Sequence, residues 1–213
     1  MTDISAIIWD FGGVLTTGPF PAFNRYEREN NLPTDFIRTV NAANPKTNAW
    51  ARFESGKISL AEFDQVFADE TEAAGHRIPG RDILPLIGGD IRPRMVEALK
   101  TCKARFQVAC LTNNMKMSPQ PDNEPPRERP TTSVMALFHL VVESSKEGVR
   151  KPDPEIYRIA CERLQIEPQQ AVFLDDLGIN LKPARAMGMR TIKVVDEDQA
   201  LAELAEHTGL RFD

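Results

Sequence analysis

Short apolar runs alternate with stretches of helical pattern along most of this chain, and this alternation constrains the fold more than any other feature. The clearest runs cover residues 4–9, 106–111, 171–174 and 191–195, and residues 137–142 form a further candidate. Such runs, some of them rich in β-branched residues, are typical of strands that helices cover on both faces. Strands separated by helices predict an α/β fold, a Rossmann-like, doubly wound parallel sheet.

The helices between these strands are indicated by the spacing of their apolar residues. Residues 92–103 and 154–164 both carry apolar side chains at helical intervals. Asp153 is expected to cap the second of these helices, with a proline at its first position. Asn180 is expected to cap a further helix that ends at Gly188.

The segment 17–90 contains no good candidate for a buried strand, and its pattern is helical over residues 21–30, 35–41, 48–54 and 60–74. An insertion of this kind predicts a small helical cap domain after the first strand, with residues 1–16 and 91–213 forming the core. The alternative is a plain set of extra helices packed on the sheet. Aromatic residues of the segment are expected to form the core of the cap rather than an apolar entrance to a site: Phe20, Phe23, Tyr26 and Trp50.

Composition argues against some classes of partner. The formal net charge is −5 and no long basic run occurs, so nothing predicts binding to nucleic acid or to an anionic membrane. No apolar run approaches the roughly 18 residues of a membrane span. Three cysteines without metal-ligand spacing, and an N-terminus unlike a signal peptide, favour a reduced cytoplasmic setting. The proline-rich segment 118–130 predicts a loop. The sequence does not distinguish a monomer from a homodimer.

Polar residues follow several of the predicted strands at the point where each strand ends. In an open parallel sheet the carboxyl ends of neighbouring strands border the ligand crevice. These side chains are therefore expected to converge on one site although they lie far apart in sequence. They are Asp10, Thr112, Asn113, Asp175 and Asp176.

The chemistry of such a site follows from its residue types. Carboxylates in one crevice repel one another and resist desolvation, so a divalent cation is expected, and hard oxygen ligands select Mg²⁺. A carboxylate can also act as a nucleophile on phosphorus. Thr112, Asn113 and Lys151 supply a hydroxyl, an amide and an ammonium group for a phosphate. Gly12 and Gly13 let the backbone approach a ligand closely.

Each of these residues alone has an ordinary interpretation as a turn residue, a helix cap or a surface charge, but their joint order is harder to dismiss. That order resembles the motifs of the haloacid dehalogenase superfamily over essentially the whole chain. The resemblance is carried by WDFGGVL at 9–15, LTNN at 111–114, KPDP at 151–154, and FLDDLG with NLKPA at 173–178 and 180–184. The last stretch is very similar to the amino-terminal phosphatase domain of soluble epoxide hydrolases. It also resembles the phosphatase-like domain fused to some acyl-CoA dehydrogenases, and residues 50–63 resemble the cap of that subgroup.

The resemblance implies a role for each residue of the expected site. Asp10 would be the nucleophile and a Mg²⁺ ligand, and Gly12 would offer its backbone carbonyl to the metal. Asp176 would be the more direct carboxylate ligand, with Asp175 beside it or acting through water. The remaining residues would bind a small phosphorylated substrate: Thr112, Asn113, Gly13 and Lys151, which would also orient the nucleophile.

Gly12 departs from the pattern of most phosphatases in this superfamily, which carry at this position a second aspartate that transfers protons. General acid–base help contributes ~10²- to 10⁴-fold, so slow turnover, dependence on good leaving groups, or proton transfer by another group or by water is expected. Three functions therefore stay open. The first is a Mg²⁺-dependent phosphatase and the second is a degenerate domain that binds a phosphorylated ligand or a partner. The third is a 2-haloacid dehalogenase, against which the pair Asp175 and Asp176 argues.

Overall fold

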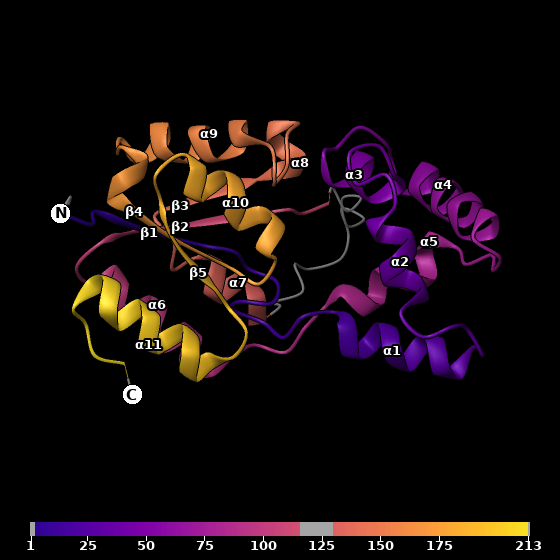
Figure 1. Ribbon diagram of the computed structural model, residues 1–213, viewed down its shortest axis with the longest axis horizontal. Helices are drawn as coiled ribbons and strands as arrows, with labels where there is room; N and C mark the ends of the chain where they lie inside the picture. Colours follow the sequence, from indigo (N-terminus) through magenta and orange to yellow (C-terminus); the bar gives the residue numbers. More distant parts are fainter. Residues whose placement is uncertain (1–2, 116–129, 213) are drawn as a thin grey trace, which may run out of the picture.

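The computed structural model of the protein describes residues 3–115 and 130–212. The loop predicted over residues 118–130 lies outside this part of the chain, apart from its last residue. The described residues form a sheet flanked by helices, and a second group of helices lies beyond the carboxyl ends of the strands (Figure 1).

The sheet has five parallel strands in the order β3-β2-β1-β4-β5. The strands are β1 (Ala6–Trp9), β2 (Gln107–Thr112), β3 (Leu140–Glu143), β4 (Ala171–Asp175) and β5 (Arg190–Lys193). The central strand β1 pairs with β2 and β4, so that Trp9 lies opposite both Cys110 and Leu174. The predicted α/β fold with a doubly wound parallel sheet is confirmed.

Alternate residues of the central strands point to opposite faces and enter two hydrophobic clusters. On one face Ile7 and Trp9 pack with α6 (Pro93–Lys103), α7 (Pro130–Met135) and α11 (Glu197–Thr208). On the other face Ala6 and Ile8 pack with α9 (Pro154–Leu164) and α10 (Gly178–Ala186). Figure 1 shows these helices as layers on either side of the sheet. The short helices α8 (Ser144–Glu147) and η2 (Pro168–Gln170) complete this part of the chain.

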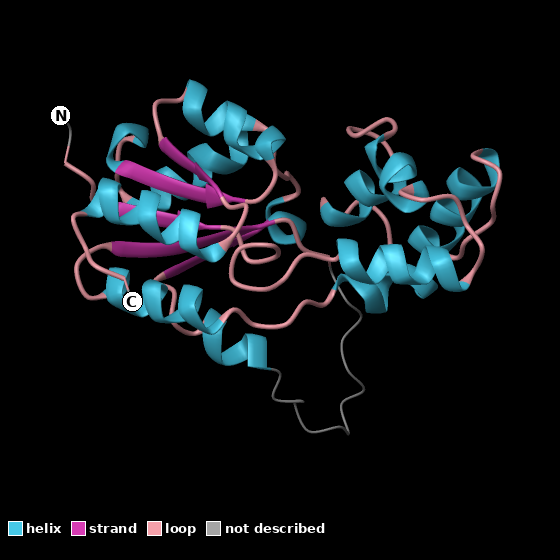
Figure 2. Cartoon of the chain, turned by 60° about the horizontal axis from the view of Figure 1, so that its bottom comes forward, coloured by secondary structure: helices cyan, strands magenta, loops and turns pink. Residues whose placement is uncertain are grey.

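We call the second group of helices the helical lobe. It consists of α1 (Phe20–Glu29), α2 (Phe36–Ala42), α3 (Ala49–Glu54), α4 (Leu60–Ala73), α5 (Gly80–Ile83) and the 3-10 helix η1 (Leu84–Ile87). The lobe has a hydrophobic cluster of its own and stands apart from the sheet (Figure 2). Phe23 and Trp50 are buried in that cluster, which agrees with the core interpretation of these aromatic residues.

The chain enters and leaves the helical lobe through two neighbouring segments. Thr16 and Ile91 form an antiparallel bridge, and the backbone N–H of Thr17 donates to the carbonyl of Asp90 over 2.8 Å. The lobe is therefore joined to the core by two paired segments that follow the loop after β1, where the polar residues of the expected site begin. The division of the chain into a core and a cap remains a prediction.

Some helix starts follow the capping signals of the sequence and others do not. The side chain of Asp153 accepts from the backbone N–H of Glu155 at the start of α9, as expected. The expectation for Asn180 is wrong, because α10 begins two residues earlier, at Gly178. Asn180 lies buried within the first turn of that helix, where its side chain donates to Asp175 instead of capping the backbone. Helix α11, for which no prediction was made, is capped by Asp196.

None of the helices in the described parts of the chain has the length and apolar character needed to span a bilayer.

Candidate active site

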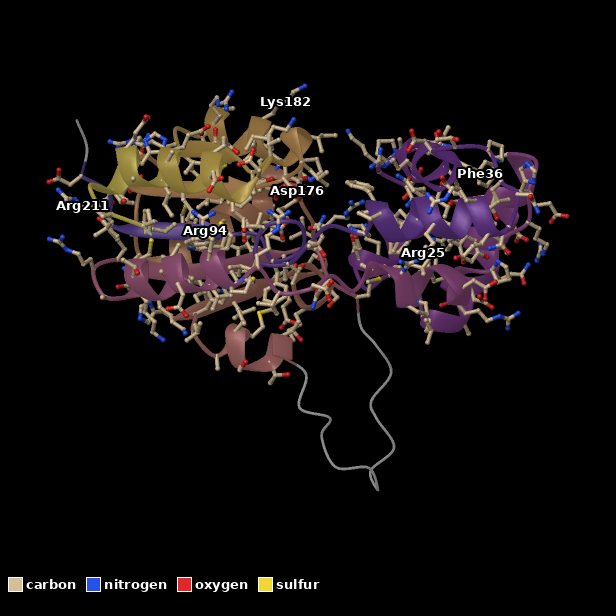
Figure 3. All side chains as sticks on the ribbon, turned by 90° about the horizontal axis from the view of Figure 1, so that it is seen from below. Arg25, Phe36, Arg94, Asp176, Lys182 and Arg211 are labelled. Atoms are coloured by element: carbon tan, nitrogen blue, oxygen red, sulfur yellow. The ribbon has the colours of Figure 1, made fainter. Side chains whose placement is uncertain are left out.

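The structure brings the predicted polar residues together at the carboxyl edge of the sheet. Asp10 follows β1, and its backbone N–H donates to the carbonyl of Leu174 at the end of β4 over 2.8 Å. Asp175 ends β4, Asp176 comes next, and Thr112 ends β2 on the other side of β1. Figure 3 shows Asp176 on the side of the sheet that faces the helical lobe. The convergence follows from strand order, because β1 lies between the strands that carry the other groups.

Lys151 reaches this cluster from the loop before α9, and its side chain is 1% exposed. Its Nζ lies 2.9 Å from Oδ1 of Asp10 and 2.7 Å from Oδ2 of Asp175. Burial alone would lower the pKa of Lys151, but the two carboxylates outweigh it and raise the pKa above its usual value. The lysine is therefore charged, and it links two carboxylates that would otherwise repel each other.

Asp175 is committed to interactions within the protein. Besides Lys151, its carboxylate accepts from the backbone N–H of Leu177 over 2.8 Å and from the side-chain amide of Asn180 over 3.1 Å at both oxygens. Asn180 is itself fixed, since its carbonyl accepts from the hydroxyl of Tyr157 over 2.6 Å. Asp175 thus has little capacity for a further ligand, and its place in the cluster is that of a support for Lys151.

Asp10 presents its two oxygens differently. Oδ1 accepts from the backbone N–H of Phe11 over 2.7 Å and from Lys151 over 2.9 Å. Both donors use the same oxygen, so Oδ2 is the atom that the described residues leave for chemistry. Burial raises the pKa of Asp10 to about 8, with Lys151 opposing the rise and Asp175 adding to it.

The three aspartates have the geometry of a cation site. One oxygen from each of Asp10, Asp175 and Asp176 lies within 4.8 Å of the other two. Burial, followed by the charge of Asp175, raises the pKa of Asp176 to about 6. A divalent cation relieves both effects, and carboxylate oxygens are the ligands that Mg²⁺ prefers. Because Asp175 is occupied, Asp10 and Asp176 are the carboxylates best placed to hold it.

Gly13 is required by the position of Asp176. Its φ is +77°, and a Cβ at this position would lie 2.4 Å from Cγ of Asp176. Gly12 is different: it is exposed, and a Cβ there would meet no atom within 4 Å. Of the two glycines, only Gly13 is demanded by the packing of this site.

The substitution Gly13→Ala is expected to displace the carboxylate of Asp176 and to lower Mg²⁺ affinity by at least about tenfold, which corresponds to about 1.4 kcal/mol. The new methyl group occupies the position of the Asp176 carboxyl, and an L residue is also strained at this φ. Isothermal titration of Mg²⁺ into both proteins measures the effect. Unchanged affinity in a folded variant would show that Asp176 does not bind the metal.

The side chain of Asn113 makes hydrogen bonds to the backbone of Lys151. Its Oδ1 accepts from the backbone N–H of Lys151 over 2.9 Å, and its Nδ2 donates to the carbonyl of Lys151 over 3.1 Å. The side-chain amide is thus engaged in fixing the backbone of Lys151. The phosphate contact predicted for Asn113 stays a prediction.

Comparison with known proteins identifies the family. A family model described as haloacid dehalogenase-like hydrolase matches residues 4–188. The chain belongs to this family. The haloacid dehalogenase superfamily predicted from the motif order is therefore confirmed.

Relatives of this haloacid dehalogenase-like hydrolase include parts of larger proteins. It is 34% identical over 210 residues to mouse acyl-CoA dehydrogenase family member 10, covering 96% of this chain and 19% of that protein. It is 31% identical to pig bifunctional epoxide hydrolase 2, covering 98% of this chain and 40% of that protein. The chain thus spans well under half the length of these two relatives. The sesquiterpene phosphatase astK of Aspergillus oryzae is 29% identical, with 98% of both chains covered.

Solved structures of the family share the fold. A HAD family enzyme of Bacteroides thetaiotaomicron, solved with magnesium and inorganic phosphate, superposes with a TM-score of 0.60 at 22% identity, covering 91% of this chain and 96% of that chain. The L-2-haloacid dehalogenase of Xanthobacter autotrophicus gives a TM-score of 0.59 at 18% identity, covering 99% and 89%. At such identities the likeness concerns the fold alone.

Several groups of the hydrolase's site were not predicted. The backbone N–H groups of Phe11 and Leu177 orient the two aspartates, but a backbone donor leaves no trace in residue identity. Asn180 was noticed as part of a motif and given the wrong role. A signal was available, because an amide five residues after Asp175 falls in the first turn of the following helix and can reach back to the strand end.

The effect of Mg²⁺ on thermal stability is expected to increase with pH. In the metal-free protein Asp10 and Asp176 have raised pKa values, about 8 and about 6, so they bind protons that the unfolded chain has already released. Their contribution to stability is complete at low pH and is lost as pH rises through these values. Mg²⁺ competes with the same protons and stabilises the ionised carboxylates.

At one hundred times its Kd, Mg²⁺ stabilises the fold by about 2.7 kcal/mol where the carboxylates are ionised. Thermal unfolding with and without Mg²⁺ at pH 5 and pH 8.5 measures the difference. We expect a clear increase in Tm at pH 8.5 and a small one at pH 5. Equal shifts at the two pH values would contradict a metal site built from these aspartates.

Proposed function

We propose that this hydrolase is a Mg²⁺-dependent phosphomonoesterase that acts through an aspartyl-phosphate on Asp10. The observation that carries the proposal is the position of Asp10, which a buried lysine holds through one oxygen while two further aspartates lie close by. A nucleophilic carboxylate, a cation site and a positive charge for phosphate are the groups that phosphoryl transfer requires. The proposed substrate is a small phosphorylated molecule, and no nucleic acid or membrane is involved.

The donor set fits Mg²⁺, which would be held by Asp10, by Asp176 and by the backbone carbonyl of Gly12. When bound, Mg²⁺ would neutralise charge on the transferring phosphoryl group. Asp175 would keep Lys151 and the first turn of α10 in place through its hydrogen bonds. Thr112, at the end of β2, would donate its hydroxyl to a phosphate oxygen.

The proposed reaction has two steps. Oδ2 of Asp10 attacks phosphorus, the ester P–O bond breaks, and the leaving group departs with the electron pair of that bond. Water then attacks the phosphorus of the aspartyl-phosphate and releases inorganic phosphate and the Asp10 carboxylate. In both steps Lys151 and the N–H of Phe11 hold Oδ1, so that the reacting oxygen keeps its orientation.

Proton transfer is the incomplete part of this site. The alkoxide formed in the first step needs a proton, and the attacking water in the second step must lose one. Gly12 has no side chain to carry out either transfer, and water takes this role in the proposal. Substrates with acidic leaving groups, such as aryl phosphates, are therefore expected to react much faster than alkyl phosphates.

The helical lobe is proposed to act as a cap over the carboxyl edge of the sheet, where it would select the substrate. Relatives named as phosphatases support the reaction class: the sesquiterpene phosphatase and the glyceraldehyde 3-phosphate phosphatase of Methanopyrus kandleri, the latter 40% identical over 59 residues. A cytoplasmic setting is also part of the proposal, and Cys102, Cys110 and Cys161 are free and buried.

The experiment that tests this function is phosphate release from p-nitrophenyl phosphate, with Mg²⁺ and with a chelator. Release that requires Mg²⁺ supports the proposal. Release that continues in the chelator would overturn the metal-dependent mechanism.

The second candidate function is binding of a phosphorylated ligand without turnover, and the observation that favours it is Gly12. A folded protein that binds inorganic phosphate in the presence of Mg²⁺, but releases none from aryl phosphates, would support this candidate instead.

A further inference from the structure

Glu54 is a carboxylate of the helical lobe that lies close to the active-site loops. It is the last residue of α3, and its side chain is 17% exposed. Its Oε2 lies 2.8 Å from Nε of Arg150, which is 24% exposed. Arg150 immediately precedes Lys151, so the lobe is paired with the loop that carries the active-site lysine.

The pKa of Glu54 also responds to the charges and dipoles of that loop. Burial raises the pKa of Glu54, while Arg150, Lys151 and the side-chain amide of Asn113 act in the opposite direction. The amide of Asn113 also holds both backbone groups of Lys151, over 2.9 Å and 3.1 Å. Glu54 is therefore linked to Lys151 by its ion pair with Arg150, the residue that precedes the lysine, and it lies in the electrostatic surroundings of the same loop.

The backbone around Glu54 is fixed on the core by close contacts. Its carbonyl accepts from the hydroxyl of Ser144 over 2.6 Å. Two residues later, Gly56 has a φ of +64°, and a Cβ there would lie 2.8 Å from the carbonyl oxygen of Ser145. On the other side, Nη1 of Arg150 donates to the carbonyl of Pro45 in the lobe over 3.3 Å. The end of α3 is thus held against the core from several directions.

We propose that Glu54 is a positioning residue that, together with Arg150, holds the loop in which Lys151 is placed against Asp10. The inference rests on the proposed phosphatase function for its kinetic consequence. In this arrangement the helical lobe supports the active site indirectly, through the pairing of Glu54 with Arg150. Lys151 reaches Asp10 and Asp175 from a backbone that Asn113 holds, and Arg150, the residue before it, is paired with a carboxylate that the lobe supplies.

The pair has a measurable consequence for catalysis. A displacement of about 1 Å at a catalytic group can reduce the rate by up to ~10²-fold. The substitution Glu54→Gln keeps the size of the side chain and removes the charge that faces Arg150. We expect kcat for p-nitrophenyl phosphate to fall about ten- to a hundredfold, and KM to change by less.

The test combines a double-mutant cycle with a measurement that does not depend on activity. Glu54→Gln, Arg150→Gln and the double variant are compared for kcat and KM. If the residues act as a unit, the double variant is no slower than the worse single variant. Hydrogen exchange of the Lys151 amide, which donates to Asn113, is followed in the metal-free proteins and is expected to be faster in all three variants.

A matched control is Glu70→Gln. Glu70 accepts from the backbone N–H of Ala49 over 2.8 Å at the other end of α3, within the lobe. This variant perturbs the same helix without facing the loop of Lys151, and both kcat and amide exchange at Lys151 are expected to stay at the wild-type values.

Three outcomes would overturn the inference. They are additive effects of the two single variants, unchanged exchange at Lys151, and a loss confined to substrates with poor leaving groups. The last would make Glu54 a proton donor rather than a positioning residue. If the wild-type protein releases no phosphate, the proposed function fails, whereas the exchange measurement still decides whether Glu54 and Arg150 hold the loop.

Discussion

The substitution Asp10→Asn is expected to reduce phosphate release by about 10⁴-fold or more, in the range that loss of a catalytic nucleophile produces. An amide is a poor nucleophile, so the covalent step cannot occur. The fold is expected to survive, because Lys151 keeps its 2.7 Å contact with Asp175. The raised pKa of Asp10 also means that its charge is costly in the metal-free protein, so the neutral amide relieves repulsion within the cluster.

Phosphate release and Tm, measured on the same preparations, separate the loss of the nucleophile from any effect on the stability of the fold. A matched control is Asp198→Asn, which removes an exposed carboxylate that pairs with Arg94 on the surface of the core. The control is expected to keep full activity. If Asp10→Asn retained a rate near that of the wild type, either another group would be the nucleophile or a contaminating phosphatase would cause the release. Repeated purification of the variant would distinguish these two explanations.

The parts of the site that sequence alone predicted are those that strand order determines. Asp10, Thr112, Asp175 and Asp176 each follow an apolar run, and in a parallel sheet the ends of such runs share one edge. Lys151 could be assigned only through its place in a motif, since its loop comes from outside the sheet. The side chain of Lys151 is 1% exposed and faces two carboxylates, and this environment arises from tertiary packing that no local sequence pattern contains.

The sequence alone could not predict the roles of residues whose partners lie on other elements. Asn180 has the residue type and the position of a helix cap, but the nearby carboxylate of Asp175 offers its amide a stronger, charge-assisted bond. Gly13 was expected to let the backbone approach a ligand, which stays a prediction, and the space it leaves for Asp176 was not foreseen. Glu54 ends a helix of the lobe, and its contact with Arg150 depends on how the lobe meets the core.

Gly12→Asp is expected to accelerate hydrolysis of alkyl phosphates by ~10²- to 10⁴-fold, the contribution of general acid–base catalysis. The structure has room for the new side chain, because a Cβ at this position meets no atom within 4 Å. The backbone also accepts it, since Gly13 has a positive φ and Gly12 does not. A carboxylic acid here lies two residues after Asp10, where it can protonate the leaving oxygen and then activate water. Aryl phosphates, whose leaving groups need little protonation, are expected to gain much less.

The comparison of Gly12→Asp with Gly12→Asn separates proton transfer from side-chain size. Asparagine fills the same space but cannot donate an acidic proton, so its kcat for alkyl phosphates is expected to stay near the wild-type value. The ratio of aryl to alkyl turnover reports the effect directly, and it should fall only in the aspartate variant. If both variants gain equally, filling the space accounts for the gain. If neither gains, proton transfer does not limit this enzyme, and the slow step must be sought in how the helical lobe admits and releases its substrate.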